Sequence, residues 1–134
     1  MQHDELIGTV QHRARLSSRG DAERSVRAVL ETLSDRLQGG EAKDLAAQLP
    51  GELGLHLTRD QERAESSERF DLDGFYRRVS DREGTEYPDA IFHTRAVVSV
   101  LEEAVSPGEM SQVRQQLGEA FAPLFEFEGD GAAG

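Results

Sequence analysis

The four histidines are the residues best suited to bind a metal ion. Two of them follow a carboxylate by four residues, Glu52 before His56 and Asp89 before His93, and residues at that spacing share one face of a helix. Neither pair has a second histidine within a turn, and the zinc-binding pattern HExxH is absent. We therefore predict no metal site and expect surface histidines near helix ends. The full set is His3, His12, His56 and His93.

A second candidate is Asp71-Leu72-Asp73-Gly74, which faintly resembles the first part of a calcium-binding loop. A third acidic or amide ligand is missing at its required spacing, and the glycine comes too early. Acidic side chains are also favourable at the N-terminus of a helix, because of its macrodipole. We therefore expect Asp71 and Asp73 to begin a helix, and we predict no calcium site.

No catalytic residue and no cofactor-binding residue is predicted. Cysteine is absent, which removes thiolate nucleophiles, thiolate metal sites and disulfides. There is no GxSxG motif, and the serines cluster at helix starts, such as Ser18, or in the polar connector. Gly39-Gly40 is expected to end a helix instead of leading into one from a strand, so it cannot cradle a phosphate. These observations weigh against an enzyme and against a bound cofactor.

Arg27 and Arg95 occupy equivalent places in two similar stretches of the chain, each followed by Ala-Val. A guanidinium group binds carboxylates and phosphates through two parallel hydrogen bonds, so one hypothesis is a shared anion site. The alternative is that each arginine bridges to an acidic neighbour across a helical turn, such as Glu23 or Glu31. We favour the second interpretation.

The aromatic side chains concentrate in the second half of the chain. Such residues usually belong to the core, and we favour that interpretation. The alternative is a partner-binding groove, because exposed aromatic patches mark interfaces. Phe70 and Phe127 are expected to be the most exposed. The residues concerned are Phe70, Phe75, Tyr76, Phe92, Phe121, Phe125 and Phe127.

The elements that hold these residues form an internal repeat. At a constant offset of 68 residues, Arg27-Ala28-Val29 pairs with Arg95-Ala96-Val97 and Gly40-Glu41 with Gly108-Glu109. Apolar positions also match apolar positions, which indicates a duplicated unit. The matched pairs are Leu33 and Leu101, Leu37 and Val105, Leu45 and Val113, Leu49 and Leu117, Leu53 and Phe121, and Leu57 and Phe125, while Leu6, Ile7 and Val10 meet Phe75, Tyr76 and Val79 at an offset of 69.

Both units predict helices, because apolar residues recur at spacings of three and four and no sustained period-two alternation appears. Asp4 is expected to cap the first helix, and Ser18, with an acidic residue three positions later, to open a long second helix. Gly39-Gly40 is expected to end that helix, and Pro88 to lie near the start of its counterpart. The predicted fold class is all-α, a helical bundle made of two tandem pseudo-equivalent helical units.

The predicted boundaries are 1–57 for the first helical unit, 58–69 for a polar connector, 70–126 for the second helical unit and 127–134 for a flexible tail. The connector contains one alanine and no larger apolar residue. We expect the two units to pack into one globule, because 134 residues fit one compact domain.

The chain is strongly acidic, with 26 Asp and Glu against 15 Lys and Arg and a formal charge of −11. This charge repels phosphate backbones, so we predict no nucleic-acid partner. The acidity either complements a basic partner or suits concentrated salt, as in a halophile, and we favour the second explanation. No stretch is long and apolar enough for a membrane span, and the N-terminus lacks the features of a signal peptide. A cytoplasmic protein is expected.

Four segments carry a resemblance to a known family: ELIGTVQHRA, RAVLETLSDRL followed by GGEAKDLAAQLP, FYRRV, and RAVVSVLEEAVSPGE. They resemble the domain-of-unknown-function 2267 family of bacteria and archaea, over essentially the whole chain outside the connector and the tail. The resemblance implies a small helical protein with the same two-unit layout. It implies no activity, cofactor or site residue.

The expected function is that of a non-enzymatic protein-interaction or regulatory module that binds another protein or itself. A contiguous exposed apolar patch between the units would favour it. The alternative is a small-molecule or ion-binding protein, or an enzyme, with its site between the two units. A cavity lined by Arg27, Arg95 or a histidine would favour that alternative. A third hypothesis, an acidic mimic of nucleic acid, would need ordered rows of carboxylates that the sequence does not show.

Overall fold

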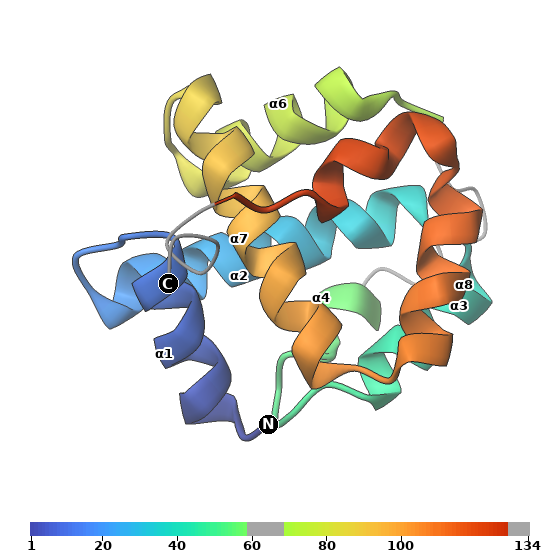
Figure 1. The fold of residues 1–134 in the computed structure, drawn as a ribbon, viewed down its shortest axis with the longest axis horizontal. Helices are drawn as coiled ribbons and strands as arrows, with labels where there is room; N and C mark the ends of the chain where they lie inside the picture. The colour runs from blue at the N-terminus through green and yellow to red at the C-terminus, as the bar shows by residue number, and fades with distance from the viewer. Residues whose placement is uncertain (59–68, 129–134) are drawn as a thin grey trace.

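The computed structural model describes residues 1–58 and 69–128, and every regular element in these two stretches is a helix. The predicted all-α class is therefore confirmed. None of these helices is long and apolar enough to cross a membrane. In chain order (Figure 1) they are α1 (His3–Arg13), α2 (Arg19–Arg36), α3 (Gly39–Ala47), α4 (Leu55–Thr58), α6 (Leu72–Glu83), α7 (Tyr87–Ala104), α8 (Pro107–Leu117) and the 3-10 helix η1 (Glu119–Phe125).

The two long helices, α2 and α7, cross at the centre of the molecule (Figure 1). Helices α1 and α6 each pack against both of them, α3 packs against α4 and α8, and η1 packs against α7 and α8. The apolar residues spaced for helices fill one continuous core, with Val29 and Leu33 of α2 beside Val97 and Leu101 of α7. Each such side chain contributes about 1.5–3 kcal/mol when fully buried.

Three of the predicted helix starts are confirmed. The side chain of Ser18 accepts a hydrogen bond from the backbone N–H of Asp21 at 3.1 Å, and Pro88 lies in the first turn of α7. Asp71 caps α6, because its side chain accepts a hydrogen bond from the backbone N–H of Gly74 at 2.8 Å. The prediction that Asp4 caps the first helix is wrong, because α1 begins at His3 and Asp4 lies within its first turn. There its carboxylate still faces the positive end of the helix.

The expected end of the second helix at Gly39-Gly40 is also wrong. Helix α2 ends at Arg36, and the two glycines are the first residues of α3. The break is made by Leu37, which has an extended backbone (φ −82°, ψ 149°) and a fully buried side chain. Val105, between α7 and α8, is likewise extended (φ −116°, ψ 150°) and buried. In both places an extended residue turns its apolar side chain into the core and redirects the chain.

Helices α3 and α8 are joined by two hydrogen bonds that follow the offset of the predicted repeat. The N–H of Gln38, before α3, donates to Oε1 of Gln116 near the end of α8 at 2.6 Å. The N–H of Ser106, before α8, donates to Oε1 of Gln48 after α3 at 2.8 Å. Gln38 and Ser106 are 68 residues apart, as are Gln48 and Gln116. The two helices therefore run antiparallel, although the duplication itself stays a prediction.

The predicted connector and tail fall mostly outside the described residues. Of 58–69, Thr58 is the last residue of α4 and Arg69 begins the second described stretch. Of 127–134, Phe127 and the residue after it are described, and the Phe127 ring packs against Phe92 with the ring centroids 5.8 Å apart. The boundaries of the two units stay predictions.

Gly54 lies where the turn before α4 touches α3, and a Cβ there would stand 2.7 Å from the backbone oxygen of Ala46. Gly54→Ala is therefore expected to lower the free energy of unfolding by about 1–3 kcal/mol, because the backbone has to move. Gly8→Ala is the matched control, since a Cβ at Gly8 in α1 meets nothing within 4 Å. It is expected to raise stability by about 0.5–1 kcal/mol. Urea unfolding measures both, and equal effects would contradict the close approach.

Candidate functional site

The structure pairs His93 with Glu83 and not with Asp89. Nδ1 of His93, in α7, lies 2.9 Å from both carboxylate oxygens of Glu83, the last residue of α6. The side chains are 13% and 5% exposed, so this is a buried polar pair that joins two helices. The expectation of a surface histidine is wrong for His93, which is largely buried against α6, whereas Asp89, four residues before it, is exposed in the first turn of α7.

The remaining histidines are placed differently. His3 lies 3.5 Å from Asp4 at the start of α1, and His12 is exposed near the end of the same helix. His56, in α4, lines a surface depression with two arginines. Among the described residues, no group of three or more His, Asp or Glu is arranged to hold a metal ion.

Asp71 and Asp73 serve the start of α6, as the sequence predicts. Besides the cap made by Asp71, Asp73 accepts hydrogen bonds from the Tyr87 hydroxyl and from Nε of Arg77. These bonds, the one from Tyr87 first, lower the pKa of the Asp73 carboxyl. The same bond raises the pKa of the Tyr87 hydroxyl. Asp71 therefore caps α6, and Asp73 joins the start of α6 to Tyr87 at the start of α7.

The structure does not bring Arg27 and Arg95 into one site. Nε of Arg95 donates to the Tyr76 hydroxyl at 3.2 Å, whereas Arg27 is exposed on α2. Of the acidic neighbours favoured as partners, Glu23 lies 3.4 Å from Arg19 and Glu31 lies 3.7 Å from Arg82, and a pairing with Arg27 stays a prediction. The equivalence of Arg27 and Arg95 in sequence therefore does not extend to their contacts.

Most of these aromatic side chains belong to the core or pack against it, as favoured from the sequence. Phe75, Tyr76 and Phe121 are buried. Phe70 and Phe127, expected to be the most exposed of them, are both partly buried. The guanidinium carbon of Arg78 in α6 lies 4.0 Å from the centroid of the Phe70 ring. The Phe127 ring packs against the ring of Phe92. Cation–π and ring contacts cover both side chains.

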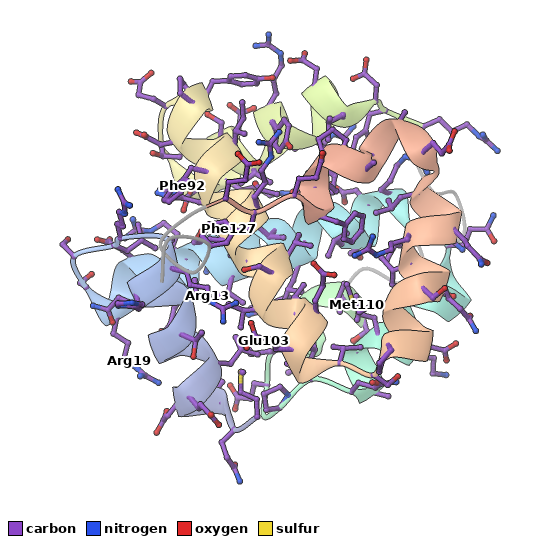
Figure 2. The ribbon with its side chains drawn as sticks, in the orientation of Figure 1. Arg13, Arg19, Phe92, Glu103, Met110 and Phe127 are labelled. Atoms are coloured by element: carbon purple, nitrogen blue, oxygen red, sulfur yellow. The ribbon has the colours of Figure 1, made fainter. Side chains whose placement is uncertain are left out.

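Each half of the chain sends an arginine to the long helix of the other half. Arg13 of α1 pairs with Glu103 of α7 and donates to Ser99 at 3.2 Å, and Figure 2 shows Arg13 and Glu103 next to one another. Arg82 of α6 lies 2.7 Å from Asp35 of α2. Arg13 and Arg82 are 69 residues apart, and Asp35 and Glu103 are 68 apart. We call these the cross-half arginines.

The Arg82 contacts form the larger of the two networks. Its guanidinium also lies 3.7 Å from Glu31 and donates to Thr32 Oγ1 at 2.9 Å. Arg78 adds a second ion pair to Asp35 at 3.1 Å. The sequence reasoning missed these residues, although Arg13 and Arg82 follow the offset of the repeat, as do their acidic partners Glu103 and Asp35.

A surface depression lies beside the N-terminal part of α2, with a volume of about 310 Å³. Two guanidinium groups and an imidazole meet there, in a chain whose formal charge is −11. Arg24, one of the two, lies 3.3 Å from Asp21 on the same helix. The depression is lined by Gly20, Glu23, Arg24, Arg27 and His56.

The sequence of the chain matches a known protein family. The family described as "Uncharacterized conserved protein (DUF2267)" matches residues 3–124, which spans α1 to η1. The chain belongs to this family. No curated protein matches the chain. Membership in DUF2267 confirms the resemblance and adds no activity.

A second surface feature of this DUF2267 protein is a shallow groove between α3 and α4, with a volume of about 380 Å³. Leu55 on its rim is 60% exposed. Among the described residues, Met1 and Leu55 are the exposed large apolar side chains, so the apolar patch expected between the two units is not seen there. The groove is lined by Lys43, Ala46, Ala47, Gly51, Gly54, Leu55 and Thr58.

These features of the DUF2267 protein are suited to binding. The groove beside Leu55 presents mostly small and apolar side chains, with Lys43 among them, and the depression at Arg27 presents two arginines, a histidine and Glu23. The buried pair of Glu83 with His93 and the half-buried group of Asp35 with its two arginines join helices.

Proposed function

We propose that this protein is a non-enzymatic interaction module that binds a protein partner through the groove beside Leu55. The observation that carries the proposal is the 60% exposure of Leu55 next to a hollow formed by alanines and glycines. Burying an exposed leucine of this kind contributes about 1.5–3 kcal/mol to an interface. The small residues leave room for an apolar side chain of the partner.

Charge indicates the kind of partner. The protein carries −11, and the exposed side chains of Asp44 and Glu52 lie on the segments that form the groove, next to the one lysine, Lys43, in its lining. A partner that presents an apolar residue flanked by basic residues would complement this surface. A nucleic acid would be repelled by the same charge. We propose the cytoplasm as the setting of this cysteine-free protein.

The test is capture by the full chain with a photo-crosslinker at Ala47, an exposed residue of the groove lining, followed by mass spectrometry of the crosslinked partner. Leu55→Asp is expected to reduce capture at least tenfold, because it places a charge in the apolar contact. Ala122→Asp is the matched control: Ala122 is an exposed residue in a different depression, beside Arg114 and Phe125. Equal loss with both variants, or no loss with Leu55→Asp, contradicts the proposal. A crosslink to a second copy identifies self-association.

A second candidate function is the binding of a small anion, and the depression lined by Arg24, Arg27 and His56 favours it. Guanidinium groups bind phosphate and carboxylate with charge-assisted hydrogen bonds. Native mass spectrometry of the same purified protein tests this candidate. A small anion that stays bound to the full chain, and is lost with Arg27→Gln but not with Leu55→Asp, supports it over the interaction module.

A further inference from the structure

Glu41 and Glu109 meet at the contact between α3 and α8. They are 68 residues apart, equivalent in the predicted repeat, and each lies in the first turn of its own helix. The reciprocal hydrogen bonds that start at Gln38 and Ser106 hold the two helices antiparallel on either side of this pair. The two carboxyl groups are close enough for a side-chain hydrogen bond.

The pair lacks a hydrogen-bond donor. Glu109 is 9% exposed, and Oε2 of Glu109 and Oε1 of Glu41 are buried without a hydrogen-bond partner in the described part of the chain. An ionised carboxylate only accepts hydrogen bonds, so two of them cannot satisfy each other. Buried polar atoms without partners are costly and rare.

We propose that Glu41 and Glu109 share one proton and form a pH-sensitive latch between the two halves of the chain. The proton turns one carboxyl into a donor, so that the O–H of Glu109 donates to the carboxylate of Glu41. One hydrogen bond then joins the two carboxyl groups, whose oxygens were unsatisfied. The proton also neutralises one of the two like charges. The role is separate from the proposed interaction groove and from the anion depression.

The surroundings of the pair favour the protonated form. Burial first, then the hydrogen bond with Glu41, then the negative charges of Glu41 and Asp44 raise the pKa of Glu109 from 4.5 to about 7. A carboxyl group removed from water and beside another carboxylate releases its proton less readily. The pair therefore changes state near neutral pH.

Charged groups on α8, η1 and α3 lie at other sites. On α8, Arg114 pairs with Glu102, and Glu119 of η1 lines the same depression as Arg114. On α3, Lys43 lines the groove beside Leu55.

The charged groups on α4 and α2, the other two elements packed against α3, also lie at other sites. His56 of α4 lines the depression at Arg27, and Arg36 of α2 donates from Nε to the backbone oxygen of Phe70 at 3.1 Å. The charges that bear on Glu109 are thus those of Glu41 and Asp44.

The direction of the pH effect follows from linkage. The folded protein holds the proton up to about pH 7, whereas the unfolded chain releases it near 4.5. Between these values the folded state binds more protons, so its stability falls as pH rises. The latch stabilises the fold in weak acid and is lost as pH rises through about 7.

The experiment compares thermal unfolding of the full chain at pH 6 and pH 8 with that of two variants. The wild type is expected to melt about 3–5 °C higher at pH 6 than at pH 8. Glu109→Gln supplies a permanent donor, so it is expected to melt at the same temperature at both pH values and above the wild type at pH 8. Glu52→Gln, at an exposed position, removes one charge and is expected to keep the wild-type difference.

Two further readouts complete the test. The side-chain carboxyl carbon of Glu109, followed by NMR, is expected to titrate near pH 7. A midpoint in the ordinary range for glutamate, or a Glu109→Gln variant that keeps the full pH difference, overturns the proposal. Millimolar calcium that raises the melting temperature of the wild type but not of Glu109→Gln at pH 8 also overturns it, because the pair is then a cation site.

Discussion

His93→Ala is expected to lower the free energy of unfolding at pH 7 by about 3–5 kcal/mol, the cost typical of removing one partner from a buried pair. Glu83, 6% exposed, has both oxygens 2.9 Å from Nδ1 of His93. Without the imidazole, the buried Glu83 side chain loses the contact that both of its oxygens make.

The size of this effect is measured by urea unfolding followed by circular dichroism. His12→Ala is the matched control, because His12 is an exposed histidine in a helix; a change within about 0.5 kcal/mol is expected there. Glu83→Gln combined with His93→Ala should recover part of the loss, since the buried charge is gone. Similar costs for His93→Ala and His12→Ala would show that the pair does not stabilise the fold.

Cutting the chain between residues 58 and 69 is expected to leave the two halves bound together, and either half alone is expected to be unfolded. Helix α1 packs against α7, and α6 packs against α2, so each half covers apolar surface of the other. Leu33 and Val97 belong to the same core cluster. A half by itself would expose that cluster and lose the cooperative unfolding transition.

A protease site placed in the connector makes the cut in the folded protein. Size-exclusion chromatography is expected to give one peak that contains both fragments, with a melting transition close to that of the intact chain. The separated fragments are expected to show no transition and to regain one when mixed. A cooperative melt of the isolated first fragment would contradict the interlocked packing.

The helices themselves could be predicted from local chemistry. Ser18 and Asp71 act as caps because their side chains reach a backbone N–H three residues ahead, which depends on sequence alone. The end of α2 could not be predicted from Gly39-Gly40, because burial of Leu37 in the core decides where the chain turns. That burial is a property of the assembled bundle.

The side-chain pairs were harder to predict than the helices. Spacing places Asp89 on the same helix face as His93, whereas the fold supplies Glu83 from another helix as the partner. The cross-half arginines were predictable in principle, since Arg13 and Arg82 and their acidic partners keep the offset of the repeat. Their ion pairs depend on how the two halves pack, which a repeat in one sequence does not specify.

The cross-half arginines bear on how such a chain could have arisen. In each half, the first helix lies against the long helices of both halves, so a single unit has nothing to complete its core. If the repeat records a gene duplication, the ancestral gene encoded the subunit of a symmetric homodimer, with each arginine paired across the twofold axis. Fusion then freed matched positions to diverge, as Leu6 and Phe75 have done. Surfaces such as the Leu55 groove could thereby come to exist once per molecule.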